Sequence, residues 1–167
     1  MKRLVLGVLL AASGFAQKVQ VESDPAVDFT KFKTFTIRQA HLNSKNPALN
    51  GELVRKRIDF DIQKYLTAKK LTYVEQGPAD LNVVYTLGSA RGVQREAYPA
   101  GWRGWGTRVV RVPFTEGTLV IDLRDPSTRS LVFRAIARED KSDAAKVESK
   151  LDDMVKKAID KYPPKGK

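Results

Sequence analysis

The residues best suited to chemistry in this sequence are arginines interleaved with aromatic side chains between positions 91 and 111. Guanidinium groups bind phosphate and carboxylate in a bidentate geometry, and exposed aromatic rings add stacking and cation–π contacts. A segment of this composition predicts a surface that binds an anionic partner. The candidate binding residues are Arg91, Arg95, Tyr98, Trp102, Arg103, Trp105, Arg108 and Arg111.

A structural role for the same segment is the competing interpretation. Trp102 and Trp105 would then fold back over the edge of a sheet, and the arginines would only solvate the loop. Tryptophan is usually mostly buried in proteins, and excess charge often serves solubility alone. The sequence leaves both interpretations open.

Catalytic chemistry finds little support in the residue pattern. His41, the single histidine, lies in a polar stretch without a serine-plus-acid pattern nearby, and there is no cysteine. No phosphate loop, dinucleotide fingerprint or paired His-Glu metal motif occurs. We therefore expect no catalytic residues, no metal site and no cofactor, and an enzyme with an unrecognised site is the lowest-ranked alternative.

Asp122 is the acidic residue that most needs an explanation. With Glu116, which would lie on the same strand face, it resembles half of an acid–base pair of carboxylates. A predicted hairpin, however, places Asp122 opposite Arg134, which indicates a structural ion pair. A surface pair of this kind contributes only about 0–1 kcal/mol, so we expect Asp122→Asn to cost little stability.

The composition is that of a basic globular domain. Of 167 residues, 42% are hydrophobic and 29% charged, and 30 Lys and Arg face 19 Asp and Glu for a formal charge of +11. These values exclude a disordered or membrane-spanning chain, and the absence of cysteine excludes a disulfide scaffold and an iron–sulfur cluster. The length fits one domain.

The first sixteen residues have the layout of a secretory signal peptide. Lys2 and Arg3 precede an apolar run that is too short to span a bilayer and that ends in small residues. We expect cleavage between Ala16 and Gln17, leaving a single domain over 17–167 with 28 basic and 19 acidic residues, a formal charge of +9. Ser13 stands where a lipoprotein would carry its lipidated cysteine, so we expect no lipid anchor.

Hydrophobic periodicity predicts the elements that must position these residues. Helices are expected over 46–69 and 142–162, each with one apolar stripe. A hairpin is expected to pair Leu123 with Phe133 and Ile121 with Ala135. Strands are expected over 18–22, 35–37, 72–75, 81–88, 107–114, 119–123 and 131–137, with polar loops over 38–48 and an irregular segment over 89–106. These elements predict an α+β fold: a mostly antiparallel sheet with two amphipathic helices packed on one face, a two-layer sandwich.

Several segments resemble the bacterial exported and lipoprotein family known as domain of unknown function 4136. The most distinctive are EGTLVIDL in residues 116–123 and YPPK in residues 162–165. Further segments are DFTKFKTF, RIDFDIQKYLTAK, ADLNVVY and LVFR, so the resemblance covers nearly the whole chain after residue 16. The family usually shows tryptophan where Phe133 stands and glycines near Lys70, Ser130 and Ala135. The resemblance implies export and an α+β fold, and it implies no particular activity.

The sequence thus predicts a non-catalytic exported domain of the cell envelope, with a binding or structural role. It would be soluble in the periplasm or outside the cell after signal cleavage, without a transmembrane span. The first alternative is a basic anion-binding module that uses residues 91–111. Its partner would be a phospholipid headgroup, a glycolipid or a wall polymer, and not nucleic acid, which an exported chain rarely meets.

Overall fold

The computed structural model describes residues 19–44, 46–88, 93–99, 107–113, 117–139 and 144–164. For 93–99 and 107–113 it describes the backbone. The expected signal peptide and its cleavage point between Ala16 and Gln17 lie outside the described residues. Among the described helices, none combines the length and the apolar character that crossing a membrane requires.

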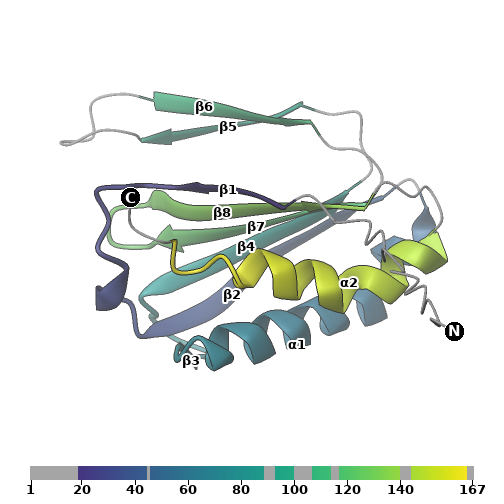
Figure 1. The fold of residues 1–167 in the computed structure, drawn as a ribbon, viewed down its shortest axis with the longest axis horizontal. Helices are drawn as coiled ribbons and strands as arrows, with labels where there is room; N and C mark the ends of the chain where they lie inside the picture. The colour runs from purple at the N-terminus through teal and green to yellow at the C-terminus, as the bar shows by residue number, and fades with distance from the viewer. Residues whose placement is uncertain are drawn as a thin grey trace, which may run out of the picture.

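A six-stranded sheet forms the centre of the molecule (Figure 1). Its order is β1-β8-β7-β4-β2-β3, and β1–β8, β8–β7 and β7–β4 are antiparallel pairs. The expected α+β fold with a mostly antiparallel sheet is therefore confirmed. The strands are β1 (Val19–Ser23), β2 (Thr34–Asn43), β3 (Thr72–Tyr73), β4 (Leu81–Gly88), β7 (Thr118–Asp125) and β8 (Ser130–Arg138).

Two helices, α1 (Glu52–Ala68) and α2 (Ala144–Ile159), cover one face of this sheet (Figure 1). Short 3-10 turns, η1 (Phe29–Lys31) and η2 (Pro47–Asn50), precede β2 and α1. The core lies between the helices and the sheet, where alternate residues of β4, β7 and β8 meet the buried stripes of both helices. The largest fully buried side chains include Tyr85, Phe35, Phe133, Ile58, Ile62 and Leu66.

The connection from β2 through α1 to β4 is a parallel crossover, which the sequence reading missed. β2 pairs in parallel with both β3 and β4. A parallel pair needs a crossover of a dozen or more residues, which α1 supplies. The sheet is therefore mixed at this end.

β2 is also longer than expected. Residues 38–43, taken as loop, continue the strand, and the register shifts between Ile37 and Gln39. A bulge at Arg38 explains both observations, because one extra residue breaks the alternation that identifies a strand in a sequence. After the bulge, Ala40 and Leu42 return to the inner face and pack against the core together with Ile37.

The hairpin β7–β8 has the expected register. Leu123 lies opposite Phe133, Ile121 opposite Ala135, and Asp122 opposite Arg134. Gly117, in the segment EGTLVIDL, begins this hairpin with a φ of 74°, and a Cβ there would lie 2.6 Å from the Glu139 carbonyl oxygen. The glycine of that segment is thus required by the backbone.

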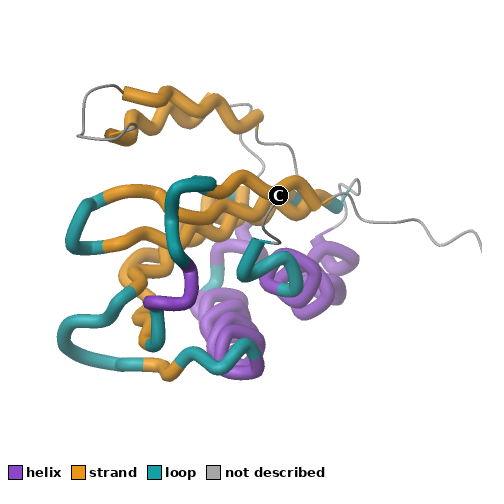
Figure 2. The backbone as a smooth tube through the Cα atoms, turned by 60° about the vertical axis from the view of Figure 1, so that its left-hand side comes forward, coloured by secondary structure: helices purple, strands orange, loops and turns teal. Residues whose placement is uncertain are grey.

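Strands β5 (Val93–Pro99) and β6 (Thr107–Pro113) form a second, two-stranded sheet. The expectation of an irregular segment over 89–106 is therefore wrong for 93–99, where the backbone is extended and paired. Figure 2 shows this ribbon apart from the main sheet, and Figure 1 shows it on the side away from the helices. Its described neighbour in the main sheet is β8.

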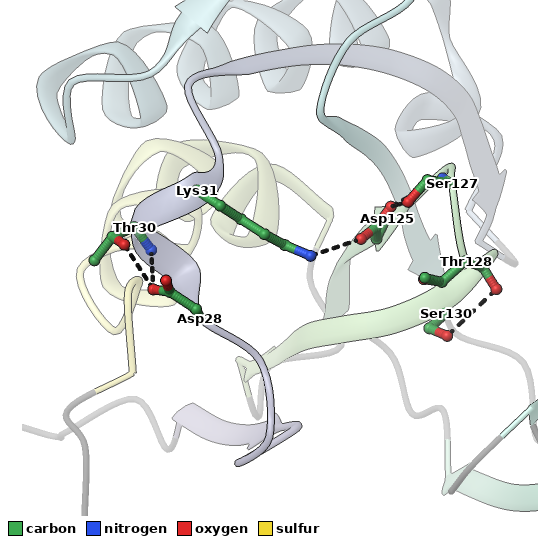
Figure 3. A network of polar contacts seen from close by, with 7 residues as sticks. All are labelled: Asp28, Thr30, Lys31, Asp125, Ser127, Thr128 and Ser130. Carbon is green, nitrogen blue, oxygen red and sulfur yellow. Dashed lines mark hydrogen bonds and ion pairs between the residues drawn. The ribbon is translucent and has the colours of Figure 1, made fainter. Parts of the chain in front are cut away.

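A polar network joins η1 to the β7–β8 turn at one end of the sheet (Figure 3). Lys31 Nζ donates to Asp125 Oδ2 at 3.1 Å, and Asp125 Oδ1 accepts from the backbone N–H of Ser127 at 2.9 Å. Burial alone would raise the pKa of Asp125, but the hydrogen bonds from Ser127 and Lys31 lower it overall. Asp28 caps η1 by accepting from Thr30 at 2.9 Å.

The tyrosine of the segment YPPK is a core residue. Tyr162 packs edge-on against Phe133 and Phe29, with ring centroids 5.5 and 5.7 Å away. Burial raises the pKa of its hydroxyl to about 12. Both segments that mark the family resemblance therefore have structural roles.

Candidate functional site

The described residues enclose a polar cleft of about 180 Å³ along the edge of β2. We call it the edge cleft. One wall is the outer edge of β2, the other is one side of α1, and β3 closes one end. The lining residues are Ile37, Arg38, Gln39, Ala40, Arg55, Asp59, Gln63 and Tyr73.

The cleft exists because β3 is too short to cover β2. β3 pairs with Thr34 and Phe35, and the last backbone hydrogen bond that the described residues form on this side joins the Val74 N–H to the Phe35 carbonyl at 2.8 Å. Peptide groups of a strand point alternately to its two sides. Counted across the bulge, the peptide groups of Ile37, Ala40 and Leu42 therefore point to the open edge.

On the helix side, Arg55, Asp59 and Tyr85 form a connected group. The Tyr85 hydroxyl donates to Asp59 Oδ1 at 2.6 Å, and Arg55 donates to Asp59 Oδ2 at 3.0 Å. The spacing of four residues puts Arg55 and Asp59 on one side of the helix. Burial, followed by the bond to Asp59, raises the pKa of Tyr85 far above its usual value, so this phenol remains protonated.

On the strand side, Arg38 and Tyr73 shape the entrance. Arg38 donates to the Gly77 carbonyl oxygen at 2.7 Å and to Asn82 Oδ1 at 3.4 Å, which fixes an exposed guanidinium beside the cleft. The Tyr73 ring packs on Phe35 at 5.4 Å between centroids. Its pKa is raised, first by burial and then by the nearby Glu75 and Asp59.

This lining favours binding over proton transfer. Two guanidinium groups and two amides offer hydrogen-bond donors, and the carboxylate of Asp59 is already held by Arg55 and Tyr85. General acid–base catalysis needs groups whose pKa values are set near the working pH. Within the described chain, no group of three or more histidine, cysteine and acidic residues is placed to hold a metal.

A cavity no larger than a few water molecules would argue against an enzyme by its size alone. The edge cleft is larger than that. One water molecule needs about 10–15 Å³ of such space, so a cleft of 180 Å³ holds several, although pockets for small molecules usually measure about 300–1,000 Å³. The volume of the cleft therefore does not decide between binding and catalysis, and the lining residues are the relevant feature.

The predicted arginine and aromatic site lies largely outside what the structure describes. Arg91, Trp102, Arg103 and Trp105 are outside the described residues. The other four predicted residues lie on the β5–β6 ribbon, where Arg95 is opposite Arg111 and Tyr98 is opposite Arg108. The register thus brings these four into two cross-strand pairs, three positions apart, and their joint role in binding stays a prediction.

Asp122 and Arg134 form a bidentate ion pair, with Arg134 Nε and Nη2 at 2.7 and 2.5 Å from the two carboxylate oxygens. Its environment differs from the one assumed from the sequence. Asp122 and Arg134 are 4% and 3% exposed, because the outer face of the sheet is also covered at its centre. The assumption of an exposed pair is therefore wrong, and we now expect Asp122→Asn to cost more than a surface pair would, since removing one partner leaves a buried charge. Glu116 lies outside the described residues.

His41 is an exposed residue of β2 opposite Thr86, and not part of a loop. By the alternation after the bulge it shares the outer face with Gln39. The residues that line the edge cleft were not selected from the sequence as a set, because they come from three elements that are adjacent only in the fold. The spacing of Arg55 and Asp59 was the one local signal.

A family model and a solved structure are similar to this chain over most of its length. The family described as Domain of unknown function (DUF4136) matches residues 19–164. A crystal structure of a DUF4136 family protein from Bacteroides thetaiotaomicron is similar with a TM-score of 0.62 at 15% identity, over 88% of this chain and 96% of that one. A PelC dodecamer from Paraburkholderia phytofirmans gives a TM-score of 0.47 at 13% identity, over 86% and 95%. No curated protein gives a significant match.

Proposed function

The chain belongs to the DUF4136 family, a domain family of unknown function, and we propose that it is an exported, non-catalytic domain of the cell envelope that acts by binding. The observation that carries the proposal is the edge cleft, an open strand edge beside two arginines. Export is inferred from the signal-peptide layout of residues 1–16.

The open edge of β2 suits an extended ligand. A peptide strand that adds to a sheet edge gains main-chain hydrogen bonds, and neighbouring pockets then select its side chains. On β2 the peptide groups of Ile37, Ala40 and Leu42 would supply those bonds, and the cleft would receive one side chain. Natural proteins usually cover or blunt such an edge, and here β3 covers only its first two residues.

The charge of the cleft selects an acidic ligand. Arg38 and Arg55 contribute two positive charges and Asp59 one negative charge, and because Arg55 is paired with Asp59, the remaining charge of the lining is that of Arg38. The chain as a whole is basic, with a formal charge of +11. An extended partner segment with a carboxylate facing the cleft therefore fits best, and bidentate arginine contacts would hold it.

Position-specific photo-crosslinking in the producing cells tests this binding site. A photoreactive residue replaces Gln39 at the cleft or, as the matched control, Gln20, which is also an exposed glutamine but lies on β1 at the opposite edge. The proposal expects a discrete adduct from position 39 that is lost with Arg38→Glu, and none from position 20. Equal adducts from both positions, or none from position 39, would contradict it.

The β5–β6 ribbon is the second candidate for anion binding. The cross-strand pairs Arg95–Arg111 and Tyr98–Arg108 place three arginines and a tyrosine on this ribbon, three register positions apart. Its partner would be a phospholipid headgroup, a phosphorylated glycolipid or an acidic wall polymer. Sedimentation with glycolipid at low and high salt tests it, and binding unchanged by Trp102→Ala with Arg103→Ala would remove the segment from consideration.

A further inference from the structure

Helix α1 carries two large apolar side chains outside its buried stripe. Leu53 is 81% exposed and Phe60 is 64% exposed. They lie seven residues apart, which is close to two full turns, so both project from the same side of the helix. That side faces away from the sheet, because the buried residues Val54, Ile58 and Ile62 lie on the opposite one.

Three cations share this side with the two apolar residues. At about 100° per residue, an arc of roughly 100° contains six residues of α1 and no acidic residue of the helix. All six are exposed: Leu53, Lys56, Arg57, Phe60, Lys64 and Thr67. We call this set the α1 ridge.

The cations of the ridge have partners that leave them accessible. Lys56 lies 3.0 Å from Glu52, Lys64 lies 3.1 Å from Asp152, and Arg57 lies 3.9 Å from Glu148. Their side chains nonetheless remain 65%, 49% and 48% exposed in the same order. Exposed ion pairs of this kind are worth about 0–1 kcal/mol, so an anionic surface can compete for these side chains.

From this arrangement we propose that the α1 ridge docks the protein on an anionic phospholipid bilayer. Leu53 and Phe60 insert between headgroups, and Lys56, Arg57 and Lys64 contact lipid phosphates. Leucine, phenylalanine and lysine on one helix side are typical of helices that lie in a membrane interface. The cores of protein interfaces are instead depleted in lysine.

The shape of the ridge also favours a bilayer over a protein partner. The two apolar side chains stand on a convex helix surface, about 10 Å apart along the axis. A protein partner would need two separate pockets at that spacing, whereas a fluid headgroup layer adapts to isolated side chains. This docking does not depend on the edge cleft, which lies on the side of α1 that carries Arg55, Asp59 and Gln63.

Vesicle co-sedimentation of the protein purified from its cells tests the proposal. The vesicles contain phosphatidylcholine alone or phosphatidylcholine with phosphatidylglycerol. We expect binding to the anionic vesicles only, and Leu53→Ser with Phe60→Ser should weaken it about ten- to one-hundred-fold. The matched control is Val21→Ser, which changes an apolar residue of β1 that is 37% exposed and should leave binding unchanged.

The charge contribution is measured separately. Lys56→Gln with Lys64→Gln should weaken binding about ten- to thirty-fold at low salt and have little effect at high salt. Lys150→Gln with Lys161→Gln is the control, because both lysines are exposed and lie off the ridge. All variants are produced with the same N-terminal sequence as the unchanged protein and are purified from cells in the same way, so any contribution from that segment cancels.

Three results would overturn the proposal. The first is equal binding to neutral and anionic vesicles, and the second is equal binding by the ridge variants and their controls. The third is loss of vesicle binding with Trp102→Ala and Arg103→Ala while the ridge variants bind normally. A protein adduct from a photoreactive residue at position 60, with no vesicle binding by the unchanged protein, would identify the ridge as a protein contact instead.

Discussion

Removing one partner of the Asp122–Arg134 ion pair should destabilise the protein strongly, whereas replacing both should not. The two side chains meet through bonds of 2.7 and 2.5 Å between β7 and β8. Both residues are buried, at 4% and 3% exposed. Because the pair is buried, the change in the free energy of unfolding depends on whether a substitution leaves one of the two charges without its partner.

The magnitude follows from that burial. Asp122→Asn keeps the shape but leaves the Arg134 guanidinium with a neutral partner, at a cost of about 3 kcal/mol. Arg134→Met should cost about 3 kcal/mol as well, since Asp122 then keeps only the more distant Arg124, at 3.6 Å. For a chain of this size, about 3 kcal/mol corresponds to a fall in Tm of roughly 6–12 °C. The double variant Asp122→Leu with Arg134→Met should recover most of this loss but not all of it, because it also removes the contact of Arg124 with Asp122 at 3.6 Å.

Urea unfolding of the four proteins in a double-mutant cycle measures the coupling free energy. Asp153→Asn is the control, since Asp153 and Lys157 form a pair of similar length, 2.8 Å, with both side chains about 40% exposed, and its loss should cost about 0–1 kcal/mol. If Asp122→Asn costs no more than Asp153→Asn, the pair behaves as a solvated surface pair and the reasoning from burial is refuted.

Three further changes test other parts of the fold. Lys70 has a φ of 69° where α1 ends, so Lys70→Gly should raise the free energy of unfolding by about 1 kcal/mol, whereas Lys70→Ala should not; equal effects would mean that the gain comes from charge. Gly117→Ala should lower it by about 1–3 kcal/mol or more, measured by urea unfolding, because of its φ of 74° and the contact with Glu139; an unchanged midpoint would contradict this. Burial and the neighbouring Asp152 raise the pKa of Asp61 above 3.8 in the folded state. Between pH 3.8 and that raised pKa, the folded state keeps a proton that the unfolded state releases. The free energy of unfolding therefore falls as the pH rises through this range. Asp61→Asn should remove this loss and match the unchanged protein near pH 3.8 but exceed it at neutral pH; parallel pH profiles would show that Asp61 is ionised in the fold.

The pairing of β7 with β8 away from the turn could be predicted because β7 alternates regularly there, although the register shifts by one residue between Leu123 and Arg124. Leu119, Ile121 and Leu123 are separated by single residues, and a turn with Asp125 and Pro126 follows. Period and turn together fix which residues face each other. The register of Asp122 and Arg134 followed from that pattern alone.

The second half of β2 could not be predicted because the bulge hides it. Arg38 adds one residue to the strand. Ile37, Ala40 and Leu42 therefore lie on one face although they are not all separated by two residues. A polar run such as 38–41 then resembles a loop. The parallel pairing of β2 with β4 was hidden for a related reason, since it depends on where α1 crosses the sheet.

Burial on the outer face of the sheet is a property of the tertiary structure. In the sequence, three outer-face residues alternate with inner-face residues, and this pattern alone indicates positions that are only half-buried. These residues, Val84, Val120 and Ile136, are nevertheless 9%, 5% and 4% exposed. Nothing in the sequences of these strands indicates that the β5–β6 ribbon lies on this side of the sheet. The edge cleft was missed for the same reason, as its walls come from β2, β3 and α1.

The proposal that this domain acts in the cell envelope is tested most directly by the intact mass of the protein in fractionated cells. Export with cleavage after Ala16 predicts a chain that begins at Gln17, without a lipid adduct, in the periplasmic or extracellular fraction. A full-length chain that retains Met1 and remains in the cytosol would contradict the account.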